Sequence, residues 1–183
     1  MALIPLDLAS LREHVWVKYC INIQLSYLLG EHVRTIGIRA APKAVTFVVF
    51  DADEQAVLNV EDIRIPVAFH TPDALKYIRN NLLDILREYR IDQAGIRVTE
   101  PNAQSPNISR IQIEGVVQEA FASSSLTSYY VGQISSISAR LGIDRADFKR
   151  YVDGPLDWPV ENWADLSKEQ REALLCAIGA SRA

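Results

Sequence analysis

The pattern of apolar and polar positions predicts a series of short strands followed mainly by helices. Three apolar runs rich in β-branched and aromatic residues follow one another closely, as expected for consecutive strands. The segments at 41–43 and 51–54 separate these runs and have the composition of turns. The three predicted strands cover residues 35–40, 44–50 and 57–65.

A helix is predicted next, because Thr71 can cap it, Pro72 suits its first position and Asp73 favours the positive end of its dipole. Apolar residues then recur at helical spacing from Leu75 to Tyr89. The remaining predicted elements are a strand at 95–99, a helix from 109, a strand at 129–131, and helices at 133–141, at 145–152 and after 167. Ser109 with Gln112, and Ser167 with Gln170, have the spacing of capping boxes at the starts of two of these helices. This order predicts an α/β domain.

Residues 1–33 do not fit this pattern, and we interpret them as an accessory segment preceding a domain at 34–183. Within 15–29, apolar residues occupy the odd positions, which favours a strand. As a helix, the same residues have a narrow polar stripe of Lys18, Asn22 and Ser26, so both interpretations stay open. Either form leaves surplus apolar surface. We therefore predict self-association or a protein partner through residues 1–33.

Composition and charge limit the classes of function. The chain has 183 residues, of which 49% are hydrophobic and 23% charged, as in a folded protein. Its net charge is −4, so any contact with nucleic acid has to use a local basic patch. Cys20 and Cys176 lack the spacing of a zinc site, and buried free thiols predict a reducing, cytoplasmic location. The apolar stretch at 15–29 is too short and too polar to cross a membrane.

Four positions carry the candidate chemistry. Glu100 directly follows the predicted strand at 95–99, and Glu169 and Glu172 are spaced to share one side of the last helix. Arg39 follows the apolar Ile36-Gly37-Ile38. With the order of elements, these positions resemble the RuvC-like branch of the ribonuclease H-like superfamily, which includes Holliday junction resolvases, over roughly residues 34 to 180. The resemblance implies a mixed five-stranded sheet with helices on both faces.

The resemblance also implies a nuclease site in which carboxylates hold two Mg²⁺ or Mn²⁺ ions. Glu100 matches the acid of the fourth strand, and Glu169 and Glu172 match the helical pair, but Arg39 stands where an aspartate is expected. A guanidinium is always charged and has no acceptor. We therefore predict that Arg39 forms an ion-pair cluster with Glu100 and with Glu169 or Glu172, which replaces the metals. No cofactor is expected, and no catalytic residue is assigned.

Simpler interpretations of these residues remain open. Glu100 can be a solvated strand end, the two helical glutamates can favour the helix dipole, and Arg39 can form an ordinary surface ion pair. Asp51 and Asp53 end the second predicted strand, where aspartates typically stabilise a turn. The sequence contains no motif of a serine hydrolase, a P-loop enzyme or a dinucleotide-binding enzyme.

The preferred hypothesis is a non-catalytic ribonuclease H-like module that binds nucleic acid or a protein partner. A local basic patch at one end of the sheet would contact phosphates. Its candidate residues, beside Arg39, are Arg34, Lys43, Arg97 and Arg110. One alternative is a Mg²⁺- or Mn²⁺-dependent, structure-selective endonuclease, whose first ligand is Asp51, Asp53 or a carboxylate of another subunit. The other is a structural subunit of a larger assembly.

Overall fold

The computed structural model describes residues 32–182. The predictions about residues 1–31, namely the accessory segment and the strand or helix at 15–29, lie outside the described residues. A compact unit begins at Val33 and contains all of the elements below. Across 32–182, no helix combines the length and the apolar character that crossing a membrane requires.

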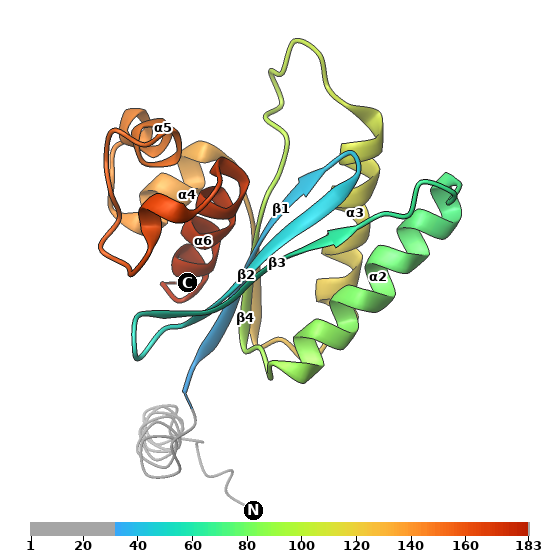
Figure 1. The fold of residues 1–183 in the computed structure, drawn as a ribbon, viewed down its shortest axis with the longest axis horizontal. Helices are drawn as coiled ribbons and strands as arrows, with labels where there is room; N and C mark the ends of the chain where they lie inside the picture. Colours follow the sequence, from blue (N-terminus) through green and yellow to red (C-terminus); the bar gives the residue numbers. More distant parts are fainter. Residues whose placement is uncertain (1–31, 183) are drawn as a thin grey trace, which may run out of the picture. The chain divides into compact units, whose positions relative to one another are not determined.

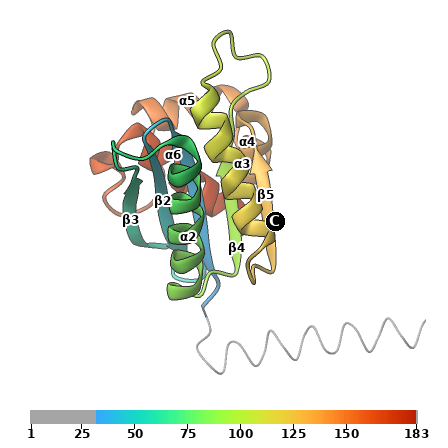
Figure 2. The same ribbon diagram turned by 90° about the vertical axis from the view of Figure 1, so that its right-hand side faces the viewer.

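Five strands form one mixed sheet in the order β3-β2-β1-β4-β5 (Figures 1 and 2). The first three strands pair antiparallel through two hairpins, whereas β4 and β5 join the other edge in parallel. The strands are β1 (Arg34–Ala41), β2 (Ala44–Asp51), β3 (Ala56–Arg64), β4 (Gln93–Arg97) and β5 (Ser128–Gly132). All five predicted strands are present, with ends shifted by up to two residues.

Helices cover both faces of this sheet, with α2 and α3 on one side and α4, α5 and α6 on the other (Figure 1). The helices are α2 (Thr71–Glu88), α3 (Ile108–Ala122), α4 (Ile134–Leu141), α5 (Arg145–Asp153) and α6 (Lys168–Ala180), with a short 3₁₀ helix η1 (Trp163–Asp165) before α6. The predicted mixed five-stranded sheet with helices on both faces is therefore confirmed.

The central strand β1 is buried on both faces, because each face packs against a helix layer. Ile36 and Ile38 belong to the core beneath α2 and α3. Thr35 points to the opposite face, where its hydroxyl donates to the carbonyl of Ala177 in α6 at 2.9 Å. Side chains alternate along a strand, so Gly37 and Arg39 also face α6. Gly37 allows α6 to lie against the sheet, since a Cβ atom there would overlap the backbone of Ala173 and Ala177.

Local sequence signals explain several helix starts. The predicted capping box of α6 is confirmed, because the Ser167 hydroxyl accepts from the Gln170 amide at 3.2 Å. Two caps differ from the prediction by one or two residues. His70, rather than Thr71, is the N-cap of α2, since Thr71 is already helical. Asn107, rather than Ser109, caps α3, because its side-chain oxygen accepts from the amide of Arg110 at 3.0 Å.

Candidate functional site

The candidate site lies between β1, β4 and α6. In the parallel pairing of β1 with β4, Arg39 lies directly beside Arg97. Both residues face α6, whose first two turns carry Glu169 and Glu172. Three elements that are far apart in the sequence thus bring two arginines and two glutamates to the same end of the sheet.

Glu172 is the acceptor shared by the two arginines. Its carboxylate forms an ion pair with Nε of Arg39, and Nη1 of Arg97 lies 3.4 Å from the same oxygen. The side chains are only 11% exposed for Arg39, 10% for Arg97 and 14% for Glu172. These ions are largely removed from water. A buried charge without a partner of opposite sign is costly, so the glutamate and the arginines stabilise each other in the folded protein.

Burial and charge act in opposite directions on Glu172. Burial raises the pKa of the Glu172 carboxyl, because it disfavours the ionised form, whereas the charges of Arg97 and Arg110 lower it. The nearby acids Glu169 and Asp153 raise this pKa further. One carboxylate carries a single negative charge and two guanidinium groups carry two positive charges, so these three residues together keep a surplus positive charge.

A cavity of about 250 Å³ adjoins this cluster. Its basic lining residues are Arg39, Arg97, Lys149 and Lys168. Its acidic lining residues are Asp153, Glu169 and Glu172. Glu169 is exposed and forms no ion pair within residues 32–182, so only one of the two helical glutamates joins the arginine cluster.

Glu100 is engaged elsewhere. The strand β4 ends at Arg97, so Glu100 lies in the following loop instead of closing the strand. One of its carboxylate oxygens accepts from the backbone amide of Ile134 at 2.9 Å, which is the first residue of α4. Glu100 thus caps the N-terminus of α4, and the predicted ion pair between Arg39 and Glu100 is not formed in the described structure.

Replacing Glu100 with alanine is expected to lower the free energy of unfolding by about 1 kcal/mol, because the first turn of α4 loses its cap. Glu100→Gln keeps an acceptor oxygen and should cost less. Urea unfolding followed by circular dichroism measures both changes. If alanine leaves stability unchanged but abolishes Mn²⁺ binding, Glu100 is a metal ligand rather than a cap.

The residues of this site do not fit the implied two-metal centre. Within residues 32–182, the carboxylates of Glu100, Glu169 and Glu172 do not form a group close enough to hold an ion. Arg39 and Arg97 supply donors alone, and both already contact the glutamate best placed to be a ligand. The predicted replacement of metal by the Arg39 guanidinium is therefore retained as a proposal.

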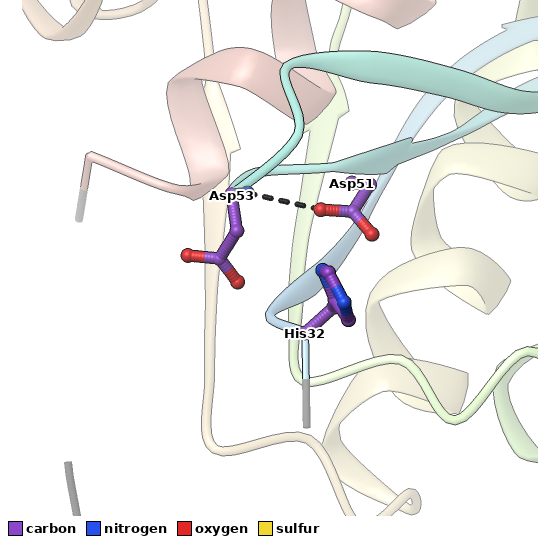
Figure 3. A group of neighbouring side chains, drawn as sticks. All are labelled: His32, Asp51 and Asp53. Atoms are coloured by element: carbon purple, nitrogen blue, oxygen red, sulfur yellow. Dashed lines mark hydrogen bonds between the residues drawn. The ribbon is translucent and has the colours of Figure 1, made fainter. Parts of the chain in front are cut away.

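A different group of potential ligands lies near the start of β1. His32, Asp51 and Asp53 each have a ligand atom within 4.8 Å of the others (Figure 3). Asp51 Oδ1 accepts from the amides of Asp53 and Glu54 at 3.0 and 2.9 Å, which confirms the two aspartates as turn residues. Asp53 also accepts from the amide of Val33 at 2.8 Å. Through these hydrogen bonds, the two aspartates stabilise the turn between β2 and β3.

This aspartate pair cannot complete the site beside Arg39. Asp51 pairs with Arg34 at the first residue of β1, whereas Arg39 is five residues further along the strand. At about 3.3 Å per residue, the two positions are roughly 17 Å apart. The alternative in which Asp51 or Asp53 reaches Glu100 is therefore wrong, because Glu100 lies at the Arg39 end of the sheet.

The predicted basic patch is only partly assembled. Arg34 lies at the opposite end of β1, where its guanidinium donates to the carbonyl of Tyr89 at 3.1 Å, so its predicted convergence is wrong. Arg97 is buried with Glu172, and Arg110 pairs with the buried Glu114 at 2.9 Å. Lys43 is exposed in the β1–β2 turn. The basic residues at the Arg39 end are thus mostly committed to ion pairs.

Sequence reasoning assigned Arg97 to this patch and missed its place in the buried cluster. No short-range signal could have found it, because the contact depends on the register between β1 and β4. The pair of Arg110 with Glu114 has the (i, i+4) spacing of helical ion pairs, so that contact was visible in the sequence.

No protein-family model matches the sequence, and no curated protein matches it. Several solved structures are similar to this chain. Thermus thermophilus RuvC superposes with a TM-score of 0.62 at 13% identity, over 82% of this chain and 94% of the RuvC chain. The same enzyme in complex with a Holliday junction substrate gives 0.63 at 15% identity, again over 82% and 94%. The yeast mitochondrial Holliday junction resolvase gives 0.53 at 11% identity, over 82% and 80%.

These similarities establish the fold. The chain has the ribonuclease H-like fold found in RuvC and in the yeast resolvase, and the resemblance inferred from the sequence is confirmed at that level. Identities of 11 to 15% do not carry the activity of those enzymes to this chain.

Proposed function

We propose that residues 34–183 form a non-catalytic ribonuclease H-like module that acts by binding, with nucleic acid as the ligand. One observation carries the proposal: Arg39 and Arg97 share Glu172 between β1, β4 and α6. In this arrangement the guanidinium groups occupy the position where divalent cations are expected from the resemblance to RuvC-like nucleases. Such groups neutralise phosphate charge but do not activate water as a metal ion does.

Nucleic acid is favoured over other ligands because of the fold and the chemistry at this end of the sheet. A structural neighbour, T. thermophilus RuvC, has been solved with a Holliday junction substrate. Here, Lys43 is exposed, and Lys149 and Lys168 border the cavity beside Arg39. Positive side chains of this kind contact the phosphate backbone without reading its sequence.

A protein partner is the second candidate, supported by exposed apolar residues. Val67 is fully exposed, and Phe69 and Ile108 are exposed as well. Val67 and Phe69 border another cavity of about 250 Å³, lined also by Ser109 at the start of α3. Exposed apolar side chains that gather around one cavity are typical of protein contacts.

The test of the proposal is a cleavage and binding assay on the full chain. We expect no cleavage of four-way junction or single-stranded DNA with Mg²⁺ or Mn²⁺, because donor-only side chains fill the site. Binding to the same DNA should weaken as salt is added, since phosphate contacts release counterions. Gel electrophoresis measures the first result and fluorescence anisotropy the second.

Arg39→Ala serves as the discriminating variant. Cleavage by the unmodified chain that persists in Arg39→Ala would support the endonuclease alternative, as would two Mn²⁺ ions near Glu100 in a soaked crystal. DNA affinity that is independent of salt would exclude the basic residues as its cause. In that case a protein partner becomes the better explanation.

A further inference from the structure

We infer that the cavity beside Arg39 and Arg97 is a binding site for a phosphoryl group. The inference deepens the proposed function and rests on it, because it names the chemical group that the module recognises. The group can be free phosphate or a phosphate of a nucleic acid, and both present the same tetrahedral oxygens.

The basic residues around the cavity outnumber the acids that pair with them. Lys168 pairs with Asp153 at 2.7 Å, and Arg39 pairs with Glu172. Arg97 has to share that same glutamate. Lys149 is exposed and forms no ion pair within the described part of the chain.

Glu169 is the only lining acid among residues 32–182 that forms no ion pair, and it is exposed to solvent. As an exposed carboxylate, it is partly screened by water. The buried charged residues of the lining are Arg39, Arg97 and Glu172, so two positive charges there face a single negative charge.

Arg97 also has an unsatisfied hydrogen-bond donor. Its Nε atom is buried and has no hydrogen-bond partner among the described residues, and the whole residue is only 8% exposed. A buried donor without an acceptor costs free energy, and donors on charged groups cost most. Phosphoryl oxygens are the acceptors that a guanidinium fork matches best, because two parallel N–H groups can bind two oxygens.

The cavity is large enough for a phosphoryl group. Its volume of about 250 Å³ holds one such group with several water molecules. The remainder of a nucleic acid would extend into solvent, to which the lining residues Lys149 and Lys168 are exposed.

The first experiment titrates the full chain with sodium phosphate, and with sodium chloride at matched ionic strength. We expect phosphate to raise the thermal unfolding temperature more than chloride does, because it binds the folded state. Arg97→Gln should weaken phosphate binding about tenfold, the loss of one charged hydrogen bond. Arg79→Gln is the matched control, since Arg79 pairs with the exposed Glu119, far in sequence from the cluster.

A second pair of variants keeps the test decisive if Arg97→Gln fails to fold. Lys149 and Arg150 are both exposed on α5, but only Lys149 lines the cavity. Lys149→Gln should weaken phosphate binding several-fold, and Arg150→Gln should change it by less than about twofold. Equal effects of phosphate and chloride, or equal effects of the paired variants, would overturn the inference.

Oligonucleotides then distinguish the source of the phosphoryl group. If the source is a terminal phosphate, a 5′-phosphorylated strand should bind more tightly than the same strand with a 5′-hydroxyl, and free phosphate should compete. If it is a backbone phosphate, the two strands should bind equally and phosphate should compete with both.

The failures of the two proposals are distinguishable. Phosphate binding that depends on Arg97, in a chain that binds no nucleic acid, supports the phosphoryl site and overturns nucleic acid as the ligand. Nucleic-acid binding that is insensitive to phosphate and to Arg97→Gln overturns the phosphoryl site and leaves the module's binding function in place.

Discussion

Gly37→Ala is expected to abolish folding or to lower the free energy of unfolding by at least about 3 kcal/mol, the upper range for overpacked cores. The added methyl group would overlap the carbonyl oxygen of Ala173 and the amide nitrogen of Ala177. Both are backbone atoms of α6, so no side-chain rotation can relieve the clash. The helix would have to move away from β1, and the Arg39–Glu172 pair would separate with it.

Gly115→Ala is the matched control for this variant. A methyl group at Gly115 meets no atom within 4 Å, and the residue lies on the exposed side of α3. Alanine should stabilise α3 by roughly 0.5–1 kcal/mol, because glycine is the poorer helix former. Thermal and urea unfolding measure both changes. A fold that tolerates alanine equally at both positions would contradict the close packing of α6 on β1.

Glu172→Ala should lower the free energy of unfolding by about 3 kcal/mol, the typical cost of removing one partner from a buried ion pair. Arg39 and Arg97 would remain largely buried beside each other without their shared carboxylate. Their positive charges would then repel. Urea unfolding at neutral pH and at two salt concentrations measures the loss, which should depend little on salt because salt screens buried charges weakly.

Glu169→Ala provides the comparison on the same helix. Glu169 is exposed and has no ion pair within the described region, so its removal should change stability by less than about 0.5 kcal/mol. The two acids would behave differently if they were metal ligands. Removing either one would then relieve repulsion between carboxylates and stabilise the metal-free protein. If Glu172→Ala and Glu169→Ala both stabilise the protein, the proposal that arginine replaces the metals is wrong.

The elements of the fold were predictable because they follow from local patterns. The apolar runs of β1 and β2, the turn residues at Asp51 and Asp53, and the capping box at Ser167 all act within a few residues. The caps of α2 and α3 were misplaced by one or two residues. In both cases the neighbouring His70 or Asn107 has the extended backbone that precedes a helix.

The candidate site was predictable only in part. Arg39 and Glu172 stood out because each matches a position of the ribonuclease H-like acidic set. Glu100 stood out for the same reason, yet it caps α4 at Ile134. The sequence does not state which donor a carboxylate will meet, since that donor comes from an element more than thirty residues away.

By itself, the sequence determined the order and type of the elements, the apolar faces that bury β1, and the permanent positive charge of Arg39. Only the tertiary structure decided that Arg97 lies beside Arg39, that Arg34 lies at the other end of the sheet, and that one glutamate serves two arginines. The physical reason is the distance along the chain over which each interaction acts. Helix and strand patterns arise from neighbours in the chain, whereas the electrostatics of the site depend on strand register and on the close approach of α6.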